Sequence, residues 1–303
     1  MPNSFSKQTI VFVVIAFAVS WGSFVVLGQL LPPSAATAVY VVFMFGPLIA
    51  GLITAMIYDR DRLVADLALR PRFNLWWLLA WLAPVLIVGA AWAISLLMPG
   101  TTSQSMADGM VALAQQQGLT LDEAAIADLP PGWVLILGAI VAGGLFNTFV
   151  AIGEEAGWRG YMWTRLRPLG FWRAVVVTGI VWGLWHAPVI ADGHNYGIGY
   201  DGYPWLGVGM MVLFTLGLSP ILGLIRDRTG TSWAPALFHG TLNAVAGLIV
   251  VVIAGGHPLV VGVPGIAGAI ALALVTVWVA LQQPDVRAPI DPATGDETPI
   301  TSR

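Results

Sequence analysis

The sequence predicts an all-α, polytopic membrane protein with about eight transmembrane helices and both termini in the cytoplasm. The chain has 303 residues, of which 57% are hydrophobic and only 10% are charged, and its mean hydropathy is +0.82. Soluble domains do not have this balance, and repeated apolar runs of about 18 residues or more indicate membrane-spanning helices. A net charge of −3 gives no reason to expect a nucleic acid as a partner.

Each predicted span has roughly the ~20 residues that a helix needs to cross a bilayer. The first, after Lys7, is too long for a signal-peptide core and lacks a small-residue cleavage site, so we expect it to be retained. The fourth is too long for one straight crossing and must tilt, protrude or break, with Gly143-Gly144 as the candidate break. The fifth contains Pro188, which we expect to bend it. The expected spans are 9–31, 37–58, 74–98, 133–164, 174–191, 205–225, 233–254 and 259–281.

The segments outside the spans carry weaker signals. In the long loop 99–132, Thr120 and Glu123 fit a capping box, which predicts a short helix to about Leu129. We expect residues 1–281 to form one integral membrane domain in the plasma membrane of a prokaryote. Residues 282–303 are rich in Pro, Asp and Thr, which is typical of a disordered tail.

The arginines predict the orientation, because short cytoplasmic loops are enriched in Lys and Arg. With both termini inside, every basic residue except Arg159 falls in a cytoplasmic segment, whereas the outer loops 99–132 and 192–204 contain none. An odd number of spans would break this pattern. The cytoplasmic basic residues would be Lys7, Arg60, Arg62, Arg70, Arg72, Arg165, Arg167, Arg173, Arg226, Arg228, Arg287 and Arg303.

Ionisable residues lie inside three of the predicted spans: Glu154, Glu155 and Arg159 in the fourth, His186 in the fifth and His239 in the seventh. Each costs ~2.5–3.5 kcal/mol at the centre of a bilayer on insertion scales, which indicates function. Counting ~1.5 Å per residue from the nearest flanking arginine puts these residues at a similar depth, ~16–20 Å from the cytoplasmic face. We therefore expect one buried cavity that opens to the cytoplasmic side.

Helical spacing assigns chemistry to these residues. Glu155 and Arg159 are four residues apart and can form an ion pair on one helix face. Glu154 points about 100° away and has no partner on its own helix, which makes it the candidate general base. His239 and Asn243 are also four residues apart, and a histidine with an amide suits the stabilisation of an oxyanion. The absence of cysteine excludes a cysteine nucleophile and thiolate metal ligands.

Structural explanations also exist for most of these residues. The Glu155–Arg159 pair can hold helices together, His186 can be a hydrogen-bonded core histidine, and Asn243 can bond between helices. Glu154 is the hardest to explain in this way, because it needs another partner. The two remaining histidines, His194 and His257, lie in outer loops and are expected to be solvated.

At these residues the chain resembles the CPBP family of CAAX proteases and bacteriocin-processing enzymes, also called the type II CAAX prenyl endopeptidase or abortive-infection family. The family pattern is Glu-Glu-x-x-x-Arg, an aromatic-x-x-x-His and His-x-x-x-Asn. The resemblance covers roughly 133–250 and departs from the pattern at position 182, where Phe is usual. The motifs stand here as Glu154-Glu155-Ala-Gly-Trp-Arg159, Trp182-Gly-Leu-Trp-His186 and His239-Gly-Thr-Leu-Asn243.

The resemblance implies intramembrane hydrolysis of a peptide bond in a membrane protein or peptide. Glu154 and His186 would activate a water, His239 and Asn243 would stabilise the oxyanion, and Glu155 and Arg159 would orient the site. The family is often labelled a metalloprotease. We favour a mechanism that requires no cofactor, and the alternative is a divalent metal such as zinc held by Glu154, His186 and His239. The competing functions are a catalytically silent scaffold or immunity protein and, with less support because no internal repeat is evident, a transporter.

Overall fold

The computed structural model describes residues 2–116, 119–120, 122–287 and 289–296, and these are mostly helical, as predicted. Two three-residue strands, β1 (Thr101–Ser103) and β2 (Ile253–Gly255), are the exception within these ranges. The α-helices are α1 (Pro2–Leu30), α2 (Ala36–Met44), α3 (Gly46–Tyr58), α4 (Leu63–Asp66), α5 (Trp76–Ser95), α6 (Met106–Gln116), α7 (Glu123–Ala127), α8 (Gly132–Gly138), α9 (Gly144–Glu155), α10 (Trp163–Leu166), α11 (Phe171–Trp185), α12 (Ala187–Ile190), α13 (Trp205–Thr229), α14 (Trp233–Val252) and α15 (Ile266–Leu281).

Six helices in the described part of the chain are long and apolar enough to cross a membrane, so the protein is an integral membrane protein. They correspond to the first four, the sixth and the seventh of the predicted spans. The other two predicted spans correspond to α11 and α15, which are apolar but only 15 and 16 residues long. At ~1.5 Å per residue these helices measure ~22–24 Å, less than the ~30 Å of a hydrocarbon core. The count of eight therefore stays a prediction.

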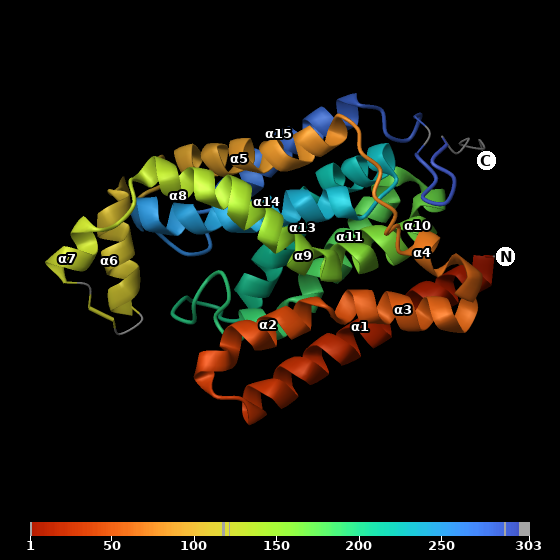
Figure 1. Ribbon diagram of the computed structural model, residues 1–303, viewed down its shortest axis with the longest axis horizontal. Coiled ribbons are helices and arrows are strands. Elements are labelled where there is room, and N and C mark those ends of the chain that lie inside the picture. The colour runs from red at the N-terminus through yellow and green to blue at the C-terminus, as the bar shows by residue number, and fades with distance from the viewer. Residues whose placement is uncertain (1, 117–118, 121, 288, 297–303) are drawn as a thin grey trace.

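The long helices run along the long axis of the molecule (Figure 1). One side is formed by α1, α2 and α3, the opposite side by α5 and α15, and α9, α11, α13 and α14 lie between them. Within this middle layer α9 packs against α14, and α11 packs against α13. The start of α1 and the described part of the C-terminal tail lie at one end of the molecule, whereas α6 and α7 lie at the other.

The fourth predicted span forms one helical run of 38 residues, Gly132–Leu169. It does not break at Gly143-Gly144. Instead, wider π-helical turns occupy Ala139–Gly143 and Ala156–Met162. At ~1.5 Å per residue the run measures ~57 Å, nearly twice the hydrocarbon thickness, so it must protrude or tilt.

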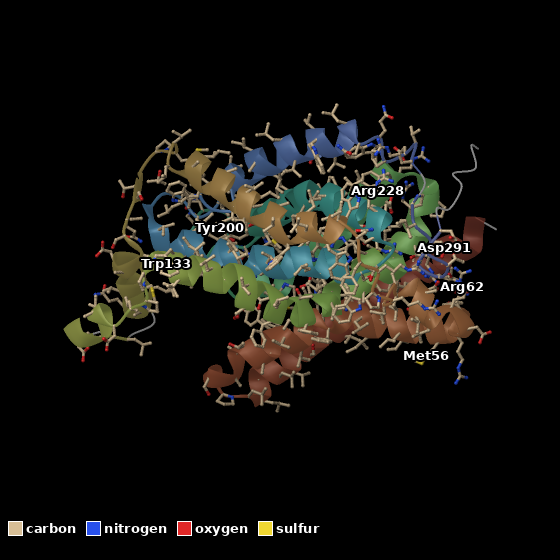
Figure 2. The ribbon with its side chains drawn as sticks, turned by 45° about the horizontal axis from the view of Figure 1, so that its top comes forward. Met56, Arg62, Trp133, Tyr200, Arg228 and Asp291 are labelled. Atoms are coloured by element: carbon tan, nitrogen blue, oxygen red, sulfur yellow. The ribbon has the colours of Figure 1, made fainter. Side chains whose placement is uncertain are left out.

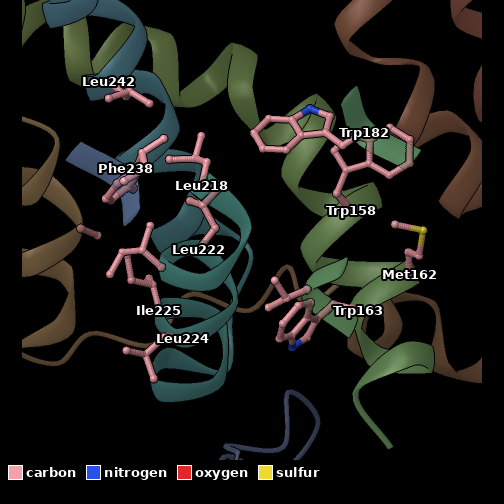
Figure 3. Packing of buried hydrophobic residues seen from close by; sticks show 14 of the residues in the cluster. Trp158, Met162, Trp163, Trp182, Leu218, Leu222, Leu224, Ile225, Phe238 and Leu242 are labelled. Carbon is pink, nitrogen blue, oxygen red and sulfur yellow. The ribbon is translucent and has the colours of Figure 1, made fainter. Parts of the chain in front are cut away.

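Small residues bring α9 and α14 into close contact, and this contact positions the polar groups of both helices. A Cβ on Gly144 would lie 2.7 Å from Thr241 Oγ1, and a Cβ on Gly240 would lie 2.5 Å from the backbone nitrogen of Thr148. Helix backbones in membranes approach this closely only where the facing residues are small. Figure 3 shows the neighbouring apolar core, which includes Leu218, Leu222, Phe238 and Leu242.

The expected bend in the fifth predicted span is present as an interruption at His186. α11 ends at Trp185, and α12 begins at Ala187 with Pro188 in its first turn. Pro188 has no N–H to donate, so the regular helical ladder cannot pass through it. The His186 nitrogen instead bonds to the Gly183 oxygen at 3.2 Å, which tightens the last turn. His186 therefore lies at the junction between α11 and α12 and not within either helix.

The C-terminal tail differs from the expectation of disorder. Arg167 Nη2 donates to the Pro284 oxygen at 2.6 Å, and Arg70 Nη1 donates to the Ala293 oxygen at 2.9 Å. The Ile290 nitrogen donates to the Asp227 oxygen at 2.8 Å. The described part of the tail, 282–287 and 289–296, is therefore held on the arginine-rich end, because its carbonyl groups satisfy guanidinium donors. Residues 297–303 lie outside the described residues.

The loop 99–132 contains the predicted short helix as α7, but the cap differs from the prediction. Asp122 Oδ1 accepts a hydrogen bond from the Ala125 nitrogen at 2.7 Å, so this carboxylate fills the role assigned to Thr120. The loop also contributes β1, which pairs with β2 in an antiparallel sheet that places Thr102 opposite Ala254. This pairing, which was not predicted from the sequence, ties the loop to the end of α14.

We predict that the arginine-rich end faces the cytoplasm. Arg62 and Tyr200 lie towards opposite ends of the molecule (Figure 2), and their neighbours Asp61 and Asp201 are both exposed. The chain has no native cysteine, so single cysteines can report the orientation. In intact cells an impermeant maleimide should label Asp201→Cys, and it should label Asp61→Cys only after permeabilisation. The opposite labelling pattern would reverse the proposed orientation.

Candidate active site

The two glutamates close α9, and Arg159 lies in the π-helical turn that follows. Glu154, Glu155 and Arg159 are each at most 2% exposed. A glycine allows this burial, because a Cβ on Gly153 would lie 2.9 Å from the carbonyl oxygen of Met44 at the end of α2. The end of α9 that carries Glu154 and Glu155 therefore packs closely against α2, and the two glutamates do not face lipid.

Glu155 accepts two charge-assisted hydrogen bonds on one oxygen. Its Oε1 lies 3.1 Å from Arg159 Nη1, which is the pair predicted from helical spacing, and 2.9 Å from His239 Nδ1. Arg159 also donates from Nη2 to Ser219 Oγ at 3.2 Å. These bonds join α9, α13 and α14 through buried polar groups, so Glu155 and Arg159 orient the groups around them.

Glu154 finds its partner on another helix. Trp182 Nε1, on α11, donates to Glu154 Oε2 at 2.6 Å. Trp182 was expected only as a departure from the family pattern, with no role of its own. Ser219 was missed entirely. The available signal was a hydroxyl directly before Pro220 inside an apolar span.

The partners of the two histidines define which nitrogen of each ring faces the site. His186 Nδ1 lies 2.8 Å from the Trp182 carbonyl oxygen. Because a carbonyl only accepts, Nδ1 carries the proton and Nε2 keeps a lone pair. His239 Nδ1 likewise donates to the Glu155 carboxylate. Both rings are therefore anchored through Nδ1, which leaves Nε2 of each available for chemistry.

The structure brings the predicted groups to one cavity of about 680 Å³. Glu154, His186, His239 and Asn243 line it, whereas Glu155 and Arg159 do not. Glu155 and Arg159 lie behind the wall, where Glu155 is bonded to His239 and Arg159 lies over the Trp182 ring, and both His239 and Trp182 line the cavity. Asn243, expected to pair with His239, is exposed at the cavity.

The direction of the cavity differs from the expectation. It was predicted to open towards the arginine-rich end, but its walls include His194, Gly256 and Pro264. These residues belong to the loops 192–204 and 253–265, which follow the ends of α12 and α14 farthest from the arginines. The depth of the polar groups along the helices does not determine which ends of the helices are splayed apart.

His194 was expected to be merely solvated, yet it lines the same cavity. Its ring lies 5.6 Å from the ring of Tyr40, measured between centroids. Tyr40 also lines the cavity and donates to Asp192 Oδ2 at 2.8 Å. This contact connects α2 to the loop after α12, so the far end of the cavity has a polar rim.

The described residues contain no preassembled cluster of three metal-ligating side chains. Within 2–116, 119–120, 122–287 and 289–296, no three His, Cys, Asp or Glu side chains are arranged so that they could hold a metal ion together. Glu154, His186 and His239 share the cavity but are each bound to different protein partners. The zinc alternative therefore stays a hypothesis, because these partners occupy only Oε2 of Glu154 and Nδ1 of the two histidines.

Comparison with known protein families agrees with the motifs. Residues 133–245 match the family model described as Type II CAAX prenyl endopeptidase Rce1-like. The matched segment contains all three motifs, from Glu154 to Asn243. No curated protein matches the chain.

We predict that Arg159→Met destabilises the protein by about 3–5 kcal/mol, because it leaves the Glu155 carboxylate buried with one charged partner fewer. Thermal unfolding in detergent checks this. The matched control is the double variant Arg159→Met with Glu155→Gln, which removes both charges and leaves an amide oxygen at position 155 that can still accept from His239. The double variant should lose less stability than Arg159→Met alone, and equal losses would contradict the proposed charge compensation.

Proposed function

We propose that this integral membrane protein is an intramembrane endopeptidase that uses a water activated by Glu154 and His186. It belongs to the CPBP/CAAX protease family through its type II CAAX prenyl endopeptidase domain at residues 133–245. The observation that carries the proposal is the division of the polar groups between the cavity and the packed helices behind it. Glu154, His186, His239 and Asn243 face one cavity, whereas Glu155 and Arg159 lie behind it. A purely structural role does not require this division.

The proposed reaction starts with a water held between Glu154 Oε1 and His186 Nε2. Glu154 takes a proton from the water while the water oxygen bonds to the carbonyl carbon of the scissile peptide. The carbonyl oxygen becomes an oxyanion, which accepts hydrogen bonds from Asn243 Nδ2 and, when His239 is protonated on both nitrogens, from His239 Nε2. When the oxyanion collapses, the C–N bond breaks and Glu154 returns its proton to the leaving amine.

The cavity walls favour an apolar substrate. Next to the polar groups they present Phe43, Met211, Phe214, Leu242 and Val250. A cavity of about 680 Å³ lies within the range of small-molecule and cofactor pockets and can take several apolar side chains or a lipid-modified residue. The substrate class we propose is a membrane-associated protein or peptide in the plasma membrane of a prokaryote, cleaved next to apolar residues.

We predict that Glu154→Gln abolishes proteolysis and leaves the fold intact. The glutamine cannot take a proton from water. The cleavage rate should therefore fall by about 10²–10⁴-fold, which is a typical general-base contribution. Its carbonyl oxygen can still accept from Trp182, so the protein should remain folded in the membrane. Two measurements check this: comparison of new peptide termini in membranes carrying the parent or the variant, and cleavage of two purified probes, an apolar transmembrane peptide and a prenylated CAAX-tail peptide.

The same experiment separates the enzyme from a silent scaffold. If the biological effect of the protein persists fully in Glu154→Gln, and no terminus depends on Glu154, the protease proposal is wrong. Asp61→Asn is the control, because Asp61 is exposed at the arginine-rich end and does not line the cavity, so its loss should not change cleavage.

We predict that the purified protein needs no stoichiometric metal for this reaction. Glu154 and both histidines already have one catalytic task each, so a ligand role would leave no obvious base beside a metal-bound water. Metal analysis of the active protein, combined with prolonged chelation, tests this. The proposal fails if the active protein carries about one zinc per chain, loses activity on chelation and regains it when zinc is restored.

A further inference from the structure

Trp182 contacts four groups of the candidate active site, each through a different part of the residue. Its indole Nε1 donates to Glu154 Oε2 at 2.6 Å, and its carbonyl oxygen accepts from His186 Nδ1 at 2.8 Å. The Arg159 guanidinium carbon lies 4.2 Å from the centroid of the indole ring. The His239 ring meets the indole nearly edge-on, with 5.5 Å between centroids.

We propose that Trp182 is a positioning residue that holds Glu154 in its catalytic orientation through the indole N–H. The bond occupies Oε2 and thereby fixes the plane of the carboxylate. Oε1 has no protein partner among the described residues, and Glu154 lines the cavity, so this second oxygen is presented to the water. The inference rests on the proposed function, because Glu154 is assigned there as the base.

Arg159 strengthens this bond without touching Glu154. Its guanidinium donates to Glu155 and Ser219 and lies over the face of the Trp182 ring. A cation on the ring face draws electron density from the indole, which makes the N–H a better donor. The indole therefore transmits the effect of the buried Arg159 charge to the Glu154 carboxylate.

The side chain and the backbone of Trp182 act on different partners, and this makes the role separable. Phe at position 182 would keep a ring over Arg159 and beside His239, but it has no N–H for Glu154. The backbone carbonyl that anchors His186 is unchanged by any substitution. Trp182→Phe therefore removes one hydrogen bond and leaves the other contacts of Trp182 in place.

The first test detects the bond without requiring activity. In protein labelled with ¹⁵N-tryptophan in detergent, the indole resonance that is absent from Trp182→Phe belongs to Trp182. In Glu154→Gln the acceptor becomes a neutral amide oxygen and the bond weakens, so this resonance should move part of the way towards those of Trp158 and Trp185, whose Nε1 atoms are buried without a protein partner. The Trp163 resonance is the internal control, because its Nε1 donates to Asp227 Oδ1 at 2.8 Å and neither residue lines the cavity, so it should not move.

The second test measures cleavage of the transmembrane-peptide and CAAX-tail probes. Loss of a hydrogen bond to a charged group predicts that Trp182→Phe lowers kcat about 10- to 100-fold, with KM changed by less than about twofold. Trp163→Phe removes an indole–carboxylate bond outside the cavity and should lower the thermal midpoint while leaving kcat unchanged. Replacement of Trp182 by benzothienylalanine, which keeps the bicyclic shape but lacks the N–H, should reproduce the loss of kcat if the phenylalanine variant folds poorly.

Each outcome decides the inference. It is overturned if the Trp182 resonance does not respond to Glu154→Gln, or if the benzothienylalanine protein retains the parent kcat. A fall in kcat that matches the fall in thermal midpoint, with the same relation in Trp163→Phe, would show a structural role only and would also overturn it. If the parent protein cleaves neither probe, the proposed function fails, whereas the resonance still decides whether Trp182 holds Glu154.

Discussion

The buried ion pair between Glu155 and Arg159 is the interaction on which the rest of the site depends. Both side chains are fully buried, and together they reach α13 through Ser219 and α14 through His239. Charged side chains inside membrane proteins are usually paired, hydrogen-bonded or turned towards a water-filled cavity. The pair therefore holds α9, α13 and α14 together at fixed positions. The positions of the groups that face the cavity follow from this arrangement.

Close helix packing complements the polar contacts. The glycines of α9 and α14 let these backbones approach, and hydrogen bonds then select one register among the arrangements that small residues permit. Packing alone would leave the helices free to slide, and polar contacts alone would not bring the backbones close enough. The combination explains why His239 Nδ1 lies within 2.9 Å of Glu155, although the two residues are 84 positions apart in the sequence.

The sequence predicted the helical architecture and the convergence of the motif residues because both depend on local signals, namely apolar run lengths and polar outliers within them. Spacing of four residues on one helix was enough to predict the Glu155–Arg159 pair. Contacts between helices were not predictable in this way. The bond from Trp182 to Glu154 depends on how α11 is rotated against α9. The direction of the cavity depends on loops such as 253–265, whose paths are set by long-range pairing with β1.

The π-helical turn at Ala156–Met162 separates two segments that are each fixed by other helices. On one side, Glu154 and Glu155 are bound by α11 and α14. On the other, Arg165 donates from Nη2 to both Asp59 and Asp66 at 2.7 Å. One residue in a regular helix corresponds to a rotation of about 100°. The wide turn thus sets the rotation between the half of this helix that carries the candidate site and its anchored end. An insertion or deletion of a single residue here would misalign the two halves without changing any side chain that takes part in either.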